Sequence, residues 1–197
     1  MVRQREVEEW AKNHQIPAEL QKRLRQTVRS DMRALRGLDD DTMLSLLPMD
    51  LQYDLRRHLY FDRACNLPFF ANLDHEVVHS FAGHLRSFTC YKDTYVVIEG
   101  EPVKSILLFF NGELEMSSIG GGSSECASLG VGDLCGSELL AWALLPSASI
   151  QNLPCSSQSV KCLTDVEAFC IFAEDLKLLG VQFNYCSKFQ QALRWHS

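Results

Sequence analysis

The sequence lacks any long apolar segment. No apolar run approaches the roughly 18 residues that a membrane-spanning helix needs. The start of the chain, MVRQREVEEW, contains no apolar run of the kind found in secretory signals. The chain as given is therefore expected neither to span a membrane nor to be directed to secretion.

Paired cysteines are also absent. The eight cysteines are scattered, and no two form a Cys-x-x-Cys pair, which argues against a zinc site. Most lie in apolar, strand-like segments, and this placement favours reduced thiols in the core of a cytosolic protein. His75 and His79 have the i, i+4 spacing of metal ligands on a helix, but no cysteine or carboxylate completes a set. We interpret them as part of a polar helix face, and we predict neither a metal site nor an enzyme active site.

Positive charge is missing from a long part of the chain, because no Lys or Arg lies between Lys104 and Lys161. The net charge of −6 is unevenly divided. Residues 1–63 carry 12 Lys and Arg against 11 Asp and Glu, whereas residues 64–197 carry 7 against 14. Duplex affinity rests largely on neutralising phosphates, so the acidic second part is not expected to bind nucleic acid.

The front segment has the pattern of several short helices. Between residues 18 and 36, apolar side chains repeat at three- and four-residue steps and mark one helix face. Arg25, Arg29 and Arg33 follow a second stripe at the same spacing. That stripe is either a solvated face or a subunit contact with acidic clusters of a neighbouring chain. The candidate clusters are Glu6, Glu8 and Glu9, or Asp39–Asp41.

From Phe88 onward the pattern changes to short strands separated by turns. The run Phe88–Ile98 is rich in aromatic and β-branched residues and is predicted as a strand, and Ile106–Phe110 as the next. Asn111-Gly112 predicts a hairpin turn into Glu113–Ser117. Further strands are expected at residues 127–129, 159–163 and 168–172, followed by a closing helix from residue 173 that is interrupted near Gly180. This order favours an antiparallel β-roll flanked by helices, an α+β fold.

One glycine-rich turn runs directly into an apolar helix, in the stretch Val131–Leu144 (VGDLCGSELLAWAL). Backbone amides at such a turn attract anions, so the arrangement is suited to a phosphate. A phosphate site usually also carries a cation, and this part of the sequence offers none.

Several separated segments have sequences typical of one protein family. They are Ile16-Pro-Ala-Glu-Leu20, Leu47-Pro-Met-Asp-Leu51 and Asp54-Leu-Arg-Arg-His-Leu59 in the front part, and Glu99-Gly-Glu-Pro102, Gly132-Asp-Leu-Cys-Gly136 and Leu163-Thr-Asp-Val-Glu-Ala-Phe169 in the second. Together they resemble the cytosolic region of plant cyclic nucleotide-gated ion channels. The resemblance implies a helical C-linker at residues 1–63 and a cyclic nucleotide-binding-like domain at residues 64–197. Its β-roll, of jelly-roll type, would span about residues 88–172, with C-terminal helices at residues 173–197.

The resemblance also implies where the chain works. It would form part of a homo- or hetero-tetrameric cation channel at the cytosolic face of the plasma membrane, with the membrane helices before Met1 and this piece itself soluble. The ligand would be cAMP or cGMP, and no other cofactor is implied.

The nucleotide-binding residues carry over only in part. The wider superfamily places a carboxylate directly after the turn glycine to accept the ribose 2′-hydroxyl, but Ser137 follows Gly136 here and Glu138 comes one position later. It also places an Arg four residues before a strand valine, where this chain has Ser156, with Ser157 adjacent. The candidate site therefore comprises Gly136, Ser137, Glu138, Leu139, Leu140, Ser156 and Ser157. Two alternatives stay open: weak nucleotide binding, or a cassette that only completes the fold.

The C-terminal segment combines bulky apolar residues with basic ones, as calmodulin targets do. The candidate contacts are Phe183, Lys188, Phe189, Leu193, Arg194 and Trp195. The resemblance implies that the chain stops just inside the family's calmodulin-binding region. The same residues are equally suited to packing over the β-roll, and the two roles would compete.

Overall fold

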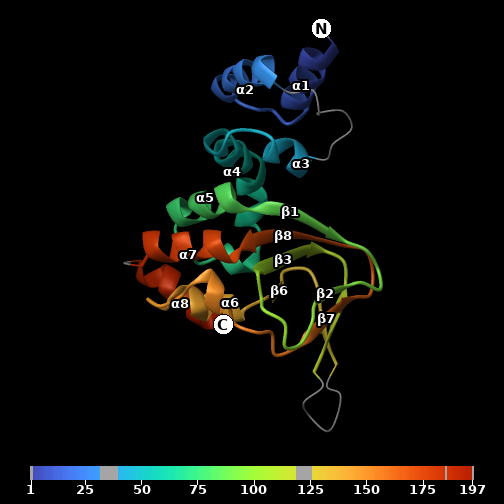
Figure 1. Ribbon diagram of the computed structural model, residues 1–197, viewed down its shortest axis with the longest axis vertical. Helices are drawn as coiled ribbons and strands as arrows, with labels where there is room; N and C mark the ends of the chain where they lie inside the picture. Colours follow the sequence, from blue (N-terminus) through green and yellow to red (C-terminus); the bar gives the residue numbers. More distant parts are fainter. Residues whose placement is uncertain (1, 32–39, 119–125, 185, 197) are drawn as a thin grey trace.

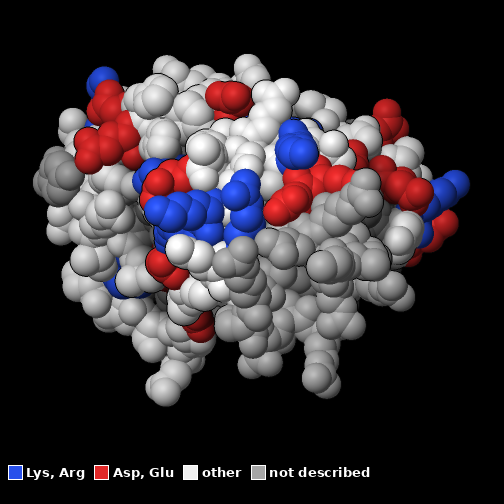
Figure 2. Space-filling view, turned by 90° about the horizontal axis from the view of Figure 1, so that it is seen from above, with Lys and Arg blue, Asp and Glu red and all other residues white. Residues whose placement is uncertain are grey.

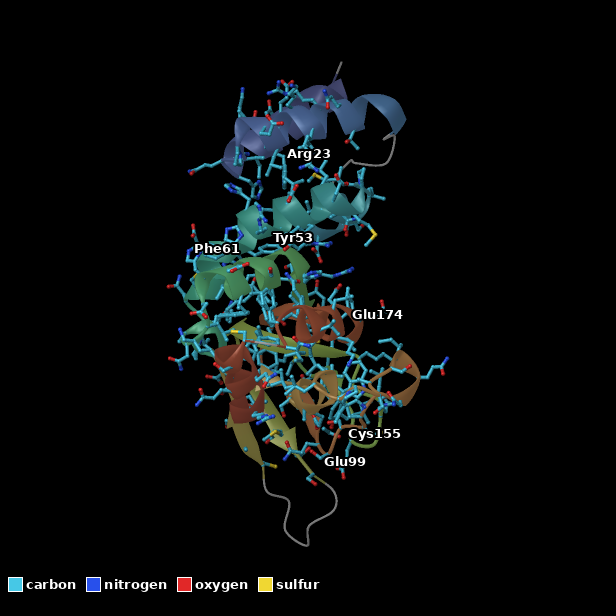
Figure 3. All side chains as sticks on the ribbon, turned by 90° about the vertical axis from the view of Figure 1, so that its left-hand side faces the viewer. Arg23, Tyr53, Phe61, Glu99, Cys155 and Glu174 are labelled. Carbon is cyan, nitrogen blue, oxygen red and sulfur yellow. The ribbon has the colours of Figure 1, made fainter. Side chains whose placement is uncertain are left out.

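The computed structural model describes residues 2–31, 40–118, 126–184 and 186–196. Within these ranges the side chains of residues 2–6, 28–31, 40, 193, 195 and 196 are not described. The described part begins with helices α1 (Val2–Asn13), α2 (Ala18–Asp31), α3 (Asp40–Ser45) and α4 (Met49–Cys65). The 3-10 helix η1 (Pro68–Phe70) and α5 (His75–His84) lead into the strands. Two views at right angles place α1 and α2 at one end of the molecule and the strands at the other (Figures 1 and 3).

The strands form two antiparallel four-stranded sheets, with orders β1-β8-β3-β6 and β2-β7-β4-β5. They are β1 (Arg86–Cys90), β2 (Tyr95–Val97), β3 (Ser105–Asn111), β4 (Leu114–Ser117), β5 (Ala127–Leu129), β6 (Leu134–Cys135), β7 (Ser159–Cys162) and β8 (Val166–Phe172). Helix α6 (Glu138–Ala143) and the 3-10 helix η2 (Ile150–Asn152) lie between β6 and β7, and α7 (Ala173–Gln182) and α8 (Ser187–His196) close the chain. The predicted fold class, an antiparallel roll with flanking helices, is confirmed.

The alternation of side chains along β3 separates two cores. Ile106 and Leu108 pack into a cluster shared with the flanking helices, whereas Leu107 and Phe109 pack into the interior between the two sheets. Successive side chains of a strand point to opposite faces, so one short apolar run serves both cores. The interior core includes four cysteines, Cys90, Cys135, Cys162 and Cys170, each unpaired, as expected for core thiols.

Helix α4 connects the front helices to the roll. Leu51 and Leu55 belong to a third core with α1, α2 and α3, while Ala64 belongs to the cluster that covers the roll. The predicted boundary between residues 63 and 64 thus falls inside one continuous helix, and the division into two domains stays a prediction. Among the described residues, no helix is both long and apolar enough to cross a membrane.

One strand prediction and one turn prediction were wrong. The run Phe88–Ile98 is two strands in different sheets, because the chain turns between them at Asp93, whose φ of 65° is left-handed. Asn111-Gly112 is not a hairpin turn, since β3 and β4 also belong to different sheets. Gly112 instead has a φ of 99° and packs against Asp165 and Val166, so it turns the chain from one sheet to the other.

The closing helix also differs from the prediction. Helix α7 continues through Gly180 and ends at Gln182. Gly180 is buried, and a side chain there would lie 3.0 Å from the carbonyl oxygen of Ala143. The glycine therefore permits close packing of α7 on α6 rather than a helix break.

Candidate functional site

The glycine turn is built around Gly136, which is buried and has a φ of 86°. A Cβ atom at this position would lie 2.5 Å from the carbonyl oxygen of Ser105. Only glycine combines this left-handed backbone with so close an approach. The turn therefore fixes where α6 begins, directly after β6.

Helix α6 is held by its apolar side. Leu139 and Leu140 have no exposed surface and belong to the core that covers the roll. Their amides donate to the carbonyl oxygens of Gly136 and Ser137 at 3.1 and 2.9 Å. These two predicted site residues are thus core residues whose N–H groups are engaged within the turn, and their part in ligand binding stays a prediction.

The predicted serine segment lies opposite the start of α6. Ser156 is 7% exposed, and its hydroxyl donates to the carbonyl oxygen of Gln158 at 2.7 Å. Its amide donates to Glu101 and its carbonyl accepts from Gly100. Ser156 is therefore engaged on every side, whereas Ser157 is exposed.

Glu138 reaches this segment from α6. Its Oε1 accepts hydrogen bonds from the Ser157 amide at 3.2 Å and from the Ser157 hydroxyl at 3.4 Å. Ser137, in the position expected for the carboxylate, is helical and makes no side-chain capping bond. The structure thus brings the two predicted stretches together through Glu138 and Ser157, although sequence reasoning had placed Glu138 out of position.

The electrostatics of this site are negative. Glu138 adds to the effect of burial, which is the main cause that raises the pKa of Cys135 to about 12. The facing turn contributes two further carboxylate residues, Glu99 and Glu101. The amide of Gly100 donates to the carbonyl oxygen of Ser156, which joins this turn to the serine segment, and Figure 3 labels the neighbouring Glu99 and Cys155 toward the end of the molecule away from α1 and α2. A phosphate bound at Ser157 would therefore lie beside the Glu138 carboxylate, and residues 105–160 supply no Lys or Arg to balance the charge.

The predicted calmodulin contacts divide between core and surface. Phe183 and Phe189 are 2% and 0% exposed and pack in the core that covers the roll. Lys188 is exposed and pairs with Asp74 at 2.7 Å. Arg194 is exposed, whereas the side chains of Leu193 and Trp195 lie outside the described residues. Packing over the roll is therefore present, and the calmodulin role stays a prediction.

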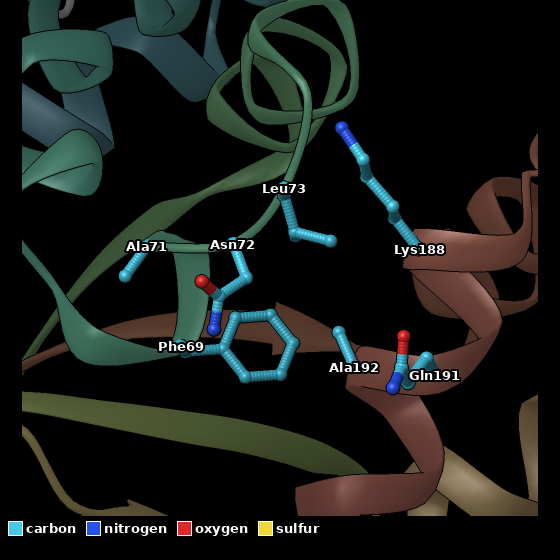
Figure 4. Close-up of a pocket in the computed structure, with 7 residues that line it drawn as sticks. All are labelled: Phe69, Ala71, Asn72, Leu73, Lys188, Gln191 and Ala192. Atoms are coloured by element: carbon cyan, nitrogen blue, oxygen red, sulfur yellow. The ribbon is translucent and has the colours of Figure 1, made fainter.

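A cavity of about 670 Å³ separates α8 from η1. Phe69 of η1 and Ala192 of α8 lie on its facing sides (Figure 4). Lys188 and Gln191 also line it from α8. Phe189 of α8 thus packs in the core, whereas Lys188, Gln191 and Ala192 of the same helix line the cavity.

The arginine stripe is only partly described. Arg25 is exposed, donates a hydrogen bond to the amide oxygen of Gln21, and lies 3.8 Å from a Glu8 carboxylate oxygen of its own chain. The side chain of Arg29 and the whole of Arg33 lie outside the described residues. Seen from the end that carries α1 and α2, basic side chains lie beside acidic ones rather than forming a face of one sign (Figure 2). Subunit contact by this stripe stays a prediction.

Two arginines that the sequence analysis did not select hold the front helices together. Arg23 of α2 pairs with Asp50, at 2.7 Å, and with Asp54 of α4. Arg56 of α4 is 5% exposed, and its Nε lies 3.7 Å from Asp41 of α3. Burial, the largest effect, lowers the pKa of Arg56 from its usual value. The i, i+4 spacing of Asp50 and Asp54 was a signal for the first pair; nothing in the sequence marked Arg56 as buried.

The two histidines pack against an aromatic ring. The rings of His75 and His79 each lie 4.6 Å from that of Phe61. Burial, followed by the charges of Arg57 and His75, lowers the pKa of His79. Within the described ranges, no group of three or more His, Cys, Asp or Glu residues could hold a metal ion.

Comparisons with known proteins place these features in a family. No family model matches the chain. Among curated proteins, cyclic nucleotide-gated ion channels 18 and 17 of Arabidopsis thaliana are 40% and 38% identical over the whole chain, which covers 28% of each. Protein CNGC15b of Medicago truncatula is 34% identical, with 32% of its length covered. The chain thus spans less than a third of each of these relatives, and the two from Arabidopsis thaliana are named as ion channels.

Two solved structures are similar to this one. The cNMP-binding domain of an Arabidopsis thaliana cyclic nucleotide-regulated ion channel is 39% identical, with 60% of this chain and 88% of that domain covered and a TM-score of 0.52. The C-linker/CNBHD of zELK channels covers 99% of this chain and 94% of its own, with a TM-score of 0.58, but at 19% identity it shows the fold alone. This chain belongs to the family of plant cyclic nucleotide-gated ion channels, and part of it corresponds to their cyclic nucleotide-binding domain.

Proposed function

We propose that this chain is the cytosolic gating region of a plant-type cyclic nucleotide-gated cation channel at the plasma membrane. In this proposal the β-roll senses cAMP or cGMP, and the front helices carry the resulting movement to a pore. Four such regions assemble in a homo- or hetero-tetramer, with Arg25, Arg29 and Arg33 at subunit contacts. The region itself performs no catalysis.

The observation that carries the proposal is the position of α4. Its first half packs in the core of the front helices through Leu51 and Leu55, and its end packs on the roll through Ala64. A helix shared by two cores transmits displacement because packed side chains do not deform continuously. Movement of the roll is thus coupled to the front helices without a flexible linker.

Charged side chains support this coupling. Asp175 of α7 accepts from His84 of α5 at 3.1 Å and lies 3.9 Å from Arg86 of β1. The guanidinium of Arg86 also stacks over the ring of Phe172, 4.6 Å from its centre. These contacts connect α7 to α5 and to β1, so a displacement of α7 is passed to both of these elements.

Nucleotide binding by the roll is proposed to be weak. A charge-assisted hydrogen bond contributes roughly 1.5–3 kcal/mol, against about 1 kcal/mol for a neutral one. A site with serines in place of an Arg should therefore bind a cyclic phosphate on the order of tenfold less tightly.

A channel chimera tests the proposed function. If this chain replaces the matching region of cyclic nucleotide-gated ion channel 18 of Arabidopsis thaliana, we expect cyclic nucleotide to open the chimera in excised patches. The cyclic nucleotide concentration for half-maximal opening should be about tenfold or more above that of a second chimera. The second chimera carries the solved 39%-identical domain together with the C-linker of that domain's own channel. Currents that do not depend on cyclic nucleotide would favour the alternative, a scaffold that binds no nucleotide and acts through subunit assembly and protein partners.

We further propose that calmodulin regulates this region by competing for the C-terminal segment of residues 181–197, which includes α8. Phe183 and Phe189 are large apolar anchors of the kind that calmodulin inserts into its grooves, but both are buried here. Calmodulin must therefore first pull the helix off the roll.

We expect a peptide of residues 181–197 to bind calcium-loaded calmodulin at least tenfold more tightly than the intact chain. The reason is that the peptide loses no packing when it binds. Isothermal titration calorimetry of both, with and without calcium, measures the difference. Equal affinities would mean that the contact does not need the buried face of α8.

A further inference from the structure

We propose that the Glu138 carboxylate is a built-in competitor for the phosphate of a cyclic nucleotide and so sets the affinity of the site. The inference rests on the proposed function, since it assigns a role to one residue of the same site. It follows from three features: which hydrogen-bond donors face outward, what occupies them, and which charges surround them.

The serine segment offers few outward donors. The Ser156 amide is used by Glu101, and the Ser156 hydroxyl donates to Gln158 and accepts from the Gln158 amide at 3.3 Å. Because these groups bond within the segment or to the facing turn, an anion cannot reach them without disrupting the backbone. The neighbouring residue, Ser157, is exposed, and its amide and hydroxyl are the donors that an anion could reach.

Both of these donors are bonded to a carboxylate. Glu138 lies 19 residues before Ser157 in the sequence, and its Oε1 accepts from the amide at 3.2 Å and from the hydroxyl at 3.4 Å. The Gly136 turn, fixed by its contact with Ser105, holds α6 in the position from which Glu138 reaches across. A carboxylate oxygen and a phosphate oxygen make the same demand on these donors, so the two compete for them.

The surrounding charges increase the effect. A phosphate that displaced Glu138 would remain beside the displaced carboxylate, and the facing turn, whose Glu101 carbonyl accepts from the Ser156 amide, adds no positive charge. No Lys or Arg lies from Ser105 to Val160 to offset these negative charges. Glu138 therefore opposes phosphate binding twice, by occupying its donors and by like-charge repulsion.

Removing the carboxylate should expose the site. We expect Glu138→Ala to bind cAMP or cGMP about tenfold more tightly than the wild-type chain, because it frees both Ser157 donors and removes one negative charge. Glu138→Gln should gain less, because it removes the charge but keeps an acceptor. Glu101→Gln is the matched control, because it removes an equal charge from an exposed side chain across the same site.

Inorganic phosphate is the decisive probe, since it needs neither base nor ribose. Titrations followed through the Ser157 amide by nuclear magnetic resonance should give about tenfold tighter phosphate binding in Glu138→Ala than in the wild-type chain, with Glu101→Gln changed less than threefold. If Glu138→Ala destabilises the fold, the smaller gain of Glu138→Gln carries the test.

The two readouts separate this inference from the proposed function. Tighter phosphate binding without tighter nucleotide binding would support the role of Glu138 and contradict nucleotide sensing. If both glutamate variants bind phosphate no more tightly than Glu101→Gln does, Glu138 is not the competitor, whatever the nucleotide titrations show.

Discussion

Alanine at Gly136 is expected to lower the free energy of unfolding of this chain by about 3 kcal/mol. The left-handed backbone costs a residue with a Cβ atom roughly 1–2 kcal/mol. The new atom would also lie 2.5 Å from the carbonyl oxygen of Ser105, which belongs to a sheet and cannot rotate away. Overpacking of this kind costs typically 1–3 kcal/mol more. Urea denaturation followed by tryptophan fluorescence measures the loss.

Two other glycines divide this cost into its parts. Gly100 has a φ of 82° but nothing within 4 Å of a new Cβ atom, so Gly100→Ala should show the backbone cost alone. Gly130 likewise has open space and no left-handed φ, so Gly130→Ala should be nearly neutral. If Gly136→Ala destabilises the chain no more than Gly100→Ala does, the contact with Ser105 relaxes freely and the turn is less rigid than described.

The sequence predicted the fold class well because its signals were local and repeated. The turn at Gly132 and Gly136, the strands predicted at residues 106–110, 159–163 and 168–172, and the inserted helix each carried their own pattern, and their order disfavoured a parallel sheet. The match of many separated segments to one family then specified the roll.

The partners of the strands were less predictable. Asn111-Gly112 is a strong hairpin signal when the flanking strands pair with each other. Here both flanking strands find other partners: β3 pairs with β6 and β8, and β4 pairs with β5 and β7. Strand pairing depends on contacts between distant parts of the chain, so the turn dipeptide alone could not decide it.

The geometry of the candidate site also depends on contacts between distant parts of the chain. Counting along the sequence placed Glu138 one residue away from the carboxylate position and gave it no partner. Its contact with Ser157 depends on the direction in which α6 leaves the Gly136 turn, and that direction is fixed by packing of Leu139 and Leu140 in the core. Burial of Arg56 likewise follows from how α3 and α4 meet, which no local pattern records.

Phe189 determines whether α8 stays on the roll. Its side chain has no exposed surface, and its ring lies 5.8 Å from the ring of Phe81 on α5 and 5.8 Å from that of Phe183. Truncating a buried Phe to Ala costs about 3–5 kcal/mol, because transfer energy is lost and a cavity remains. We therefore expect Phe189→Ala to lower the free energy of unfolding by about 3 kcal/mol or more.

The exposed Gln191 on the same helix provides the control, because Gln191→Ala removes a polar side chain from the rim of the cavity and should change stability by less than about 0.5 kcal/mol. Chemical denaturation measures both variants. Hydrogen exchange of the Gln190 amide, which donates to Cys186 at the start of α8, reports the helix separately. If Phe189→Ala raises this exchange rate by more than the loss of global stability explains, α8 opens as an independent unit, as competition with calmodulin requires. A loss below about 1 kcal/mol with unchanged exchange would show that other contacts hold the helix.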